Sequence, residues 1–247
     1  MIKLEKTTVH GFEAAVCGMR NPMNSWDKSD SDFSCRRCDG CYYEPERHRE
    51  EYDGVSDTWC EKTALRIGHS DLTLMRVLAK AGDDHGKFLR MINVTADITA
   101  PRYWWTEFDT YKVGTVANSC STMHKLTSKP IELSDFSLDD FEAVHVSGKR
   151  LGVEDGYLSF SQLLEQTVFD CEYLRKKYVE TNDQKYWRGL IQLLPQSYNQ
   201  RRTVQLNYQV LGHMYFARKN HKLTEWHDFC DWALTLPYFR EIVVQEG

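Results

Sequence analysis

The chain has 247 residues, of which 41% are hydrophobic and 27% charged, as in an ordinary globular protein. Its net charge of −5 argues against a duplex nucleic acid as partner, because proteins that bind duplexes carry a cationic stripe for the phosphates. The sequence has no apolar run of membrane-spanning length and no secretory leader, so we expect a cytoplasmic protein with reduced thiols and no membrane partner.

Hydrophobic periodicity and capping residues predict an α+β fold. In chain order we expect a strand and a short helix in residues 1–19, an irregular polar segment over 21–70, a helix over 71–81, a strand over 88–98, a helix from Pro101, a polar loop over 118–122, a polar connector over 129–156, and helices over 160–181, 183–194, 202–219 and 224–234. Ser70 is the expected N-cap of the helix over 71–81, and Gly82 its stop. We expect one domain over 1–247 with a cysteine-rich insertion at about 21–70.

The insertion contains three closely spaced thiols, Cys35, Cys38 and Cys41. With Cys60 or Cys17 as a fourth ligand, they would suit a tetrahedral structural zinc, which would stabilise a segment too polar to fold alone. Free surface thiols are the alternative, and the spacing disfavours an iron–sulfur site. The remaining cysteines, Cys120, Cys171 and Cys230, are most simply core residues.

Residues 98–124 concentrate aromatic, hydroxyl and cationic side chains in one short stretch. Trp104 and Trp105 suit a buried helix face or a subunit interface, and an aromatic core helix followed by a polar loop would explain the composition without any ligand. The short donors Ser119 and Ser121, with Lys112 nearby, would also suit a phosphate or a nucleobase.

Five segments, in this order, resemble the flavin-dependent thymidylate synthases, which methylate dUMP with FAD and a folate methylene donor. They are FEAAVCGMR (12–20), LMRVLAKAGDDH (74–85), VTADITAPRYWW (94–105), NSCSTMH (118–124) and LLPQSYNQRRTVQLNYQVLGHMYFAR (193–218). Arg102 and Trp104 match the family's Ala-Arg-Gln-Trp run, Asn118 and Ser121 match Asn-Glu-x-Ser-x-Arg-Tyr, and Asn207 matches Asn-x-Arg. The resemblance covers most of the chain outside the insertion and the connector.

The resemblance implies an α+β fold with a mixed sheet flanked by helices, a homotetramer, and active sites built from more than one subunit. It implies flavin-dependent transfer of a one-carbon unit to a pyrimidine deoxynucleotide, dUMP to dTMP or a close variant. FAD is the expected cofactor, and a folate methylene donor, NADPH and the structural zinc are further candidates. The family chemistry needs no protein nucleophile, so no catalytic residue is assigned.

Candidate ligand residues follow from the matched positions and from nearby polar side chains. For the nucleotide they are Tyr103, Lys112, Ser119, Ser121, Arg201, Arg202 and Asn207; for the cofactor they are His85, Arg102, Glu107, Asn118 and His124.

The family's cations are largely missing from this sequence. Thr106, Glu107 and Phe108 stand at its Arg-His-Arg, and Met123 and Gln209 replace two further arginines. Another arginine of the family, late in the chain, falls near Asp228, and the run at residues 47–49 is interpreted as solvated charge. Because charge-assisted bonds to a phosphate contribute about 1.5–3 kcal/mol each, other cations must replace them. The candidates are Lys112, Lys125, Arg201 and Arg202.

Three functions therefore stay open. The first is an enzyme rewired for the same or a related pyrimidine nucleotide, which is the one that we favour. The second is a non-catalytic nucleotide- or flavin-binding protein on the same fold. The third is a zinc-stabilised interaction module centred on the cysteine cluster.

Overall fold

Residues 2–32, 66–139, 145–147 and 157–245 are described by the structure, which is a computed structural model. They fall into two units. Unit 1 comprises Met1–Val9 and Asn93–Leu236, and unit 2 comprises His10–Ile92 and Pro237–Gly247. The single domain expected over residues 1–247 stays a prediction.

A four-stranded sheet forms the centre of unit 1. Its strands are β1 (Lys3–His10), β2 (Asn93–Pro101), β6 (Asn199–Asn207) and β3 (Thr115–Ser119), in that order across the sheet. The central strand β6 pairs antiparallel with both β2 and β3. On β2, Val94, Ala96 and Ile98 are fully buried, as expected where alternate side chains of a strand point into a core.

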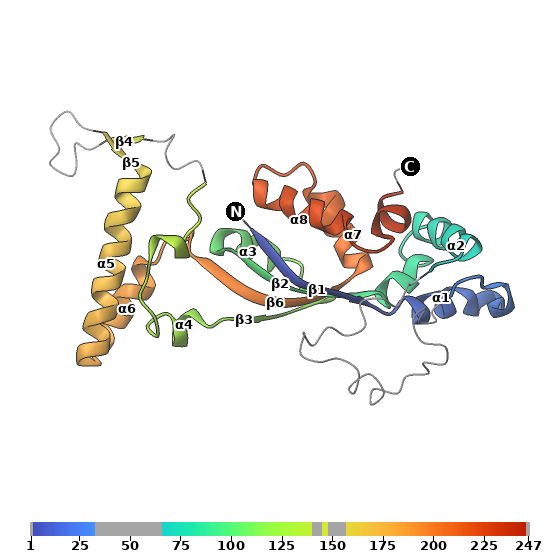
Figure 1. Cartoon of the computed structure of the whole chain (residues 1–247), viewed down its shortest axis with the longest axis horizontal. Coiled ribbons are helices and arrows are strands. Elements are labelled where there is room, and N and C mark those ends of the chain that lie inside the picture. The colour runs from blue at the N-terminus through green and yellow to red at the C-terminus, as the bar shows by residue number, and fades with distance from the viewer. Residues whose placement is uncertain (1, 33–65, 140–144, 148–156, 246–247) are drawn as a thin grey trace, which may run out of the picture. The chain divides into compact units, whose positions relative to one another are not determined.

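Three helices cover the buried face of this sheet: α3 (Arg102–Phe108), α7 (Tyr208–Arg218) and α8 (Thr224–Leu234) (Figure 1). Pro101 ends β2 and is the N-cap of α3, which begins at Arg102. Its ring fixes φ, and a helix start has no use for its missing N–H, because the first N–H groups of a helix have no partner within it. α7 starts where the Asn207 side chain accepts a hydrogen bond from Val210 N–H at 3.1 Å.

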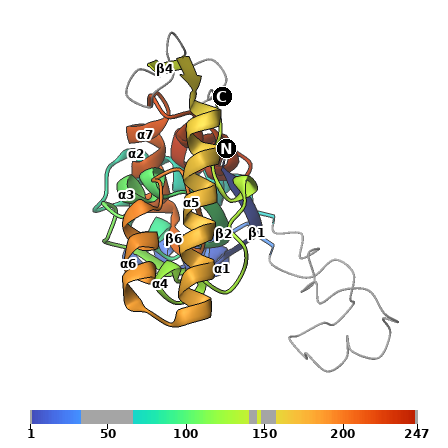
Figure 2. The ribbon, with the colours of Figure 1, turned by 90° about the vertical axis from the view of Figure 1, so that its left-hand side faces the viewer.

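A helical hairpin, α5 (Phe160–Thr181) and α6 (Gln184–Leu193), belongs to the same unit, and Figure 2 shows its helices side by side. Asp183 caps α6 through a hydrogen bond from Lys185 N–H of 3.0 Å. The hairpin's own apolar core includes Leu164, Val168 and Leu190. The smaller elements of unit 1 are α4 (Thr122–Lys125), a 3₁₀ turn (Leu133–Asp135), β4 (His145–Ser147) and β5 (Tyr157–Ser159).

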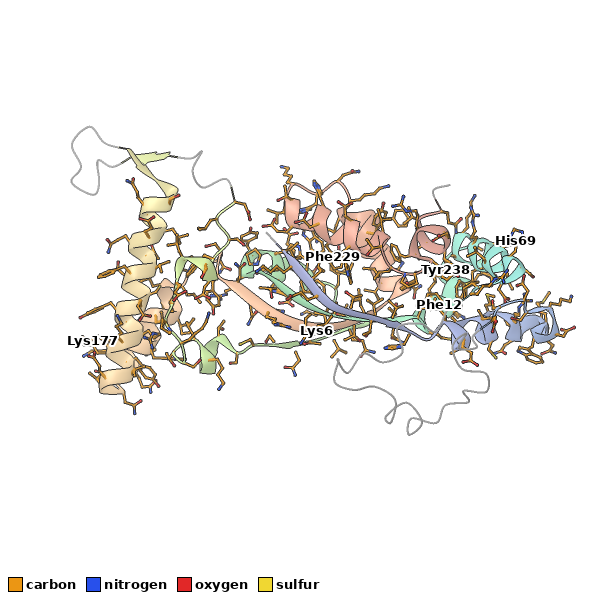
Figure 3. All side chains as sticks on the ribbon, in the orientation of Figure 1. Lys6, Phe12, His69, Lys177, Phe229 and Tyr238 are labelled. Carbon is orange, nitrogen blue, oxygen red and sulfur yellow. The ribbon has the colours of Figure 1, made fainter. Side chains whose placement is uncertain are left out.

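Unit 2 is helical, with α1 (Phe12–Arg20) and α2 (His69–Lys80) as its main elements. Short 3₁₀ turns span Asn21–Met23, Trp26–Lys28 and Gly86–Arg90, and a π-helical turn spans Arg240–Val244. The ring of Phe12 packs edge-on against Tyr238, with centroids 5.9 Å apart, and Figure 3 shows these two side chains.

A buried ion pair ties the described segments of unit 2 together. Arg20 at the end of α1 donates from Nε to Asp71 Oδ1 in α2 at 2.6 Å, and both side chains are buried. The Ser29 and Ser31 hydroxyls donate to the other carboxylate oxygen at 2.7 and 2.6 Å. Burial raises the pKa of Asp71, but the hydrogen bonds from Ser31, Ser29 and Arg20 outweigh it, so its pKa lies below the ordinary value.

The predicted α+β class is confirmed, as are the strand–helix start of the chain and the helices over 160–181 and 224–234. The capping prediction for Ser70 is wrong. The helix begins earlier, after Gly68, and the Asp30 carboxylate accepts from the backbone N–H groups of Ser70 and Asp71 at 2.8 and 3.1 Å. Gly82 does follow the helix end, in the left-handed conformation (φ 100°).

Three other boundaries differ from the prediction. Residues 86–90 form a 3₁₀ turn, and the strand expected over 88–98 begins only at Asn93. The polar loop expected at 118–122 is in part strand, because β3 runs to Ser119. The helix expected over 202–219 begins at Tyr208, since the residues before it complete the sheet as β6. In each case pairing with a distant strand decides the conformation, which local periodicity does not report.

Candidate functional site

The aromatic residues of α3 belong to the core of unit 1. Trp104, Trp105 and Phe108 are at most 2% exposed. The Trp104 ring lies 4.7 Å from that of Trp226 and 5.8 Å from that of Phe229, a residue of α8 labelled in Figure 3. The prediction that the two tryptophans suit a buried helix face is confirmed, and neither is positioned to stack on a ligand.

Glu107, which stands at the family's histidine, is held by internal partners. Its Oε2 atom accepts from Arg218 at 2.8 Å and from Trp226 Nε1 at 2.9 Å, and His221 Nε2 lies 3.3 Å away. Arg218 also stacks over the Trp226 ring at 4.8 Å and donates to the Tyr111 hydroxyl at 2.9 Å. The cofactor role predicted for Glu107 stays a prediction, but its carboxylate serves here to join α3, α7 and α8.

We expect Glu107→Gln to lower the free energy of unfolding by about 1 kcal/mol, because it removes the charge that Arg218 and Trp226 bind, in a side chain that is 33% exposed. Urea denaturation measures the change. Glu180→Gln is the matched control, since Glu180 pairs with Lys177 on the surface of α5 and should have almost no effect. Equal losses in the two variants would contradict the structural role of Glu107.

The two arginines predicted to bind the nucleotide are paired with carboxylates. Arg202 donates to Asp109 at 2.6 Å and stacks over the Trp105 ring at 4.2 Å. Arg201 donates to Asp97 at 2.5 Å, although its side chain remains 47% exposed. The hydrogen bonds to Asp97 from Thr203 and Arg201 hold the pKa of that carboxyl below its usual range. A phosphate would have to compete with these carboxylates.

The Tyr103 hydroxyl donates to Glu225, a buried carboxylate in the first turn of α8. Burial and the neighbouring Glu225 both raise the pKa of Tyr103, so the phenol stays protonated. Asn207 is likewise occupied, as the cap of α7. These two predicted nucleotide ligands therefore have structural partners within unit 1.

The other predicted ligand residues of unit 1 are more accessible. Arg102 is half-buried, and its guanidinium makes no ion pair with any residue that the structure describes. Asn118 and Ser119 are exposed on β3, and Ser121 follows them, half-buried. His124 lies in α4, and its side chain is outside the described part of the structure.

Lys112 lies beside an open hollow of about 460 Å³ on the helix-covered side of β3. The hollow is lined by Phe108, Asp109, Lys112, Thr115 and Ala117. Gly114 makes the turn into β3 with a φ of 79°, and a Cβ atom there would lie 2.8 Å from Val210. The turn thus places a lysine, a hydroxyl and an apolar wall around one space, next to Asn118 and Ser119.

His85 belongs to unit 2, where it is exposed before the 3₁₀ turn at Gly86–Arg90. Its cofactor role stays a prediction. Cys35, Cys38, Cys41 and Cys60 lie outside the described residues, and within the described ranges no group of three or more potential ligands is placed to hold a metal ion.

Burial raises the pKa of both Cys171 and Cys230 to about 11, so these two thiols are protonated core residues, as predicted. Cys120 is exposed, and the prediction for it is wrong. In the described part of the chain, no helix combines the length and the apolar character needed to cross a bilayer.

Sequence reasoning missed the partners of these side chains. Arg218 appeared only as a residue near the end of a predicted helix, and His221, Asp109 and Glu225 carried no signal of a site. The one available clue was that Glu107 replaces a cation. An acid in that position needs a cationic partner, and the partner lies 111 residues away in the chain.

No protein-family model and no curated protein matches the sequence. Solved structures do. A structure of thymidylate synthase X (ThyX) from Helicobacter pylori with FAD and dUMP matches with a TM-score of 0.60 at 15% identity, over 99% of this chain and 98% of that chain. A second structure of flavin-dependent ThyX from the same organism, complexed with FAD and dUMP, gives 0.59 at 15% identity over the same shares.

The UMP/dUMP methylase PolB from Streptomyces cacaoi, bound with 5-Br dUMP, matches with a TM-score of 0.53 at 14% identity, over 100% of this chain and 95% of that chain. At these identities the likeness defines the fold alone. The chain has the α+β fold of the flavin-dependent thymidylate synthases and of a related dUMP methylase.

Proposed function

We propose that this protein binds a pyrimidine deoxynucleotide and FAD and transfers a one-carbon unit to the nucleotide, from dUMP to dTMP or a close variant. The observation that carries the proposal is the match in fold, over nearly the whole chain, to proteins solved with FAD and dUMP. The proposal includes assembly as a homotetramer in the cytoplasm.

The side chains around β3 fit a nucleotide. At the hollow, Lys112 can neutralise a phosphate, and the Ser119 hydroxyl, on the same face of β3 as Thr115 and Ala117, can bond to a sugar or to the edge of a pyrimidine. Arg102 supplies a second, half-buried cation at the start of α3. FAD, when bound, would supply the redox and one-carbon chemistry, while the protein binds and orients. The residues at the family's Arg-His-Arg do not fit a flavin phosphate, because Glu107 is anionic and Phe108 is buried.

That misfit favours one second candidate, a protein that binds a nucleotide or flavin without turning it over. An assay with FAD, dUMP, a methylene-donating folate and NADPH separates the two. The proposed enzyme is expected to be yellow and to add one methyl group to the nucleotide, detected by mass spectrometry. A protein that binds dUMP but yields no methylated product would support the second candidate.

We expect Arg102→Ala to weaken dUMP or FAD binding about ten- to hundredfold, because a charge-assisted bond contributes about 1.5–3 kcal/mol. Ser121→Ala should weaken it less, by about fivefold, since a neutral bond contributes about 1 kcal/mol. Isothermal titration calorimetry measures both. Arg188→Ala, an exposed arginine of α6, is the control and should bind normally. Unchanged affinity in both test variants would contradict the proposed site.

A further inference from the structure

The two edges of the sheet in unit 1 are protected differently. The outer strand β1 carries Lys3, Glu5 and Lys6, and Lys6 interrupts its extended backbone with a φ of 49°. Charges and kinks of this kind prevent an edge strand from pairing with another chain. The other edge strand, β3, reads Thr-Val-Ala-Asn-Ser and has no charge and no proline, and its register with β6 is unbroken from Thr115 to Ser119.

The hydrogen-bonding groups on the outer side of β3 can be identified from its pairing with β6. Cys120 N–H donates to the Arg201 carbonyl at 2.9 Å, so Cys120 directs its backbone groups toward β6. Successive residues of an antiparallel strand alternate in this respect. Residues 116 and 118 therefore also bond to β6, and Thr115, Ala117 and Ser119 direct their N–H and C=O groups away from the sheet.

From this arrangement we propose that two copies of the chain pair through β3, antiparallel and two-fold symmetric about Ala117. Ala117 then faces Ala117 of the second copy, and Thr115 faces Ser119 of the second copy. Each outward residue donates and accepts one bond, which gives about six backbone hydrogen bonds and joins the two sheets into one. This pairing would be one of the contacts of the homotetramer in the proposed function. It rests on the proposed function only because it needs a second copy of the chain.

A second copy suits this edge better than an unrelated peptide does. The strand is complementary to itself, because its central residue is small and no like charges come opposite each other when it pairs with its own symmetry mate. Val116, which is 66% exposed, would gain cover from Asn118 of the second copy on the open face of the sheet. An unrelated extended peptide could form the same backbone bonds, but its residues would not be matched to those of β3 by symmetry.

The pairing would also complete the hollow beside Lys112. Thr115 and Ala117 line that hollow, so their side chains lie on the helix-covered side of the sheet. A two-fold axis perpendicular to the sheet keeps each face on its own side. Ser119 of the second copy would therefore stand beside Thr115 at the rim of the hollow, and each hollow would gain a wall and a hydroxyl from the other copy.

The test uses opposite charges at Ala117. In the symmetric pair, Ala117→Lys places two ammonium groups opposite each other, and Ala117→Glu does the same with two carboxylates. We expect each variant alone to show half the wild-type particle mass in sedimentation equilibrium, and an equimolar mixture to recover the wild-type mass. Ala117→Ser, which adds no charge, is the control and should keep the wild-type mass. Circular dichroism verifies that every variant is folded.

The proposal is overturned if the wild-type protein is a monomer, if Ala117→Lys keeps the wild-type mass, or if the mixture does not reassociate. In the second case the chain assembles through another surface. Titration of wild-type protein with dUMP distinguishes this failure from that of the proposed function. Normal dUMP binding with an unchanged Ala117→Lys mass refutes the β3 interface alone, and absent dUMP binding with the expected masses refutes the nucleotide proposal alone.

Discussion

Replacing Asp71 with alanine is expected to lower the free energy of unfolding by about 3–5 kcal/mol, because it leaves the buried Arg20 guanidinium without its counter-charge. The Ser29 and Ser31 hydroxyls would lose their acceptor as well. Urea denaturation monitored by circular dichroism measures the loss. Asp183→Ala, which removes an exposed helix cap, is the matched control and should cost about 1 kcal/mol.

The same carboxylate predicts a pH dependence. The pKa of Asp71 is lower in the folded chain than its value of about 3.9 in an unfolded one. A depressed pKa stabilises the fold above the unfolded value, and the contribution is lost as the pH falls below about 4 and through the folded pKa. The wild-type protein should therefore lose more stability than Asp71→Asn between pH 5 and pH 3, a range set by these values of about 4. Equal losses would contradict the ion pair.

Replacing Trp226 with alanine is expected to cost about 3–5 kcal/mol, since its ring is fully buried against Trp104 and Phe229. Trp226→Phe keeps part of the ring packing but loses the Nε1–H bond to Glu107, so it should cost less, about 1–3 kcal/mol. Phe216→Ala is the control, because that ring is 52% exposed and its loss should change stability by less than about 1 kcal/mol. If Trp226→Ala and Phe216→Ala were equally stable, the aromatic cluster would not be the core of unit 1.

Much of the fold follows from local signals in the sequence. The helices over 160–181 and 224–234 begin and end at the predicted residues. β6 was missed because Leu206, Val210 and Met214 recur at helical spacing, and pairing with β2 and β3 decides that Leu206 belongs to a strand. Such pairing is decided by residues far away in the chain, which a local pattern does not contain.

The candidate site was less predictable than the fold. The positions of Lys112, Asn118 and Ser119 around one strand follow from their closeness in the sequence. The pairing of Arg202 with Asp109 and of Glu107 with Arg218 depends on tertiary packing. Side chains that the sequence suggests as ligand-binding residues therefore bind other residues of the protein instead. A resemblance in motif order therefore indicates where a site lies more reliably than which side chains remain available in it.

The most direct measurement for the central claim is calorimetric titration of the purified protein with dUMP, with dAMP as the purine control. We expect saturable binding of dUMP that is weakened by Arg102→Ala and Lys112→Ala and is absent for dAMP. Absence of dUMP binding by a protein saturated with FAD, or equal binding of both nucleotides, would contradict the central claim.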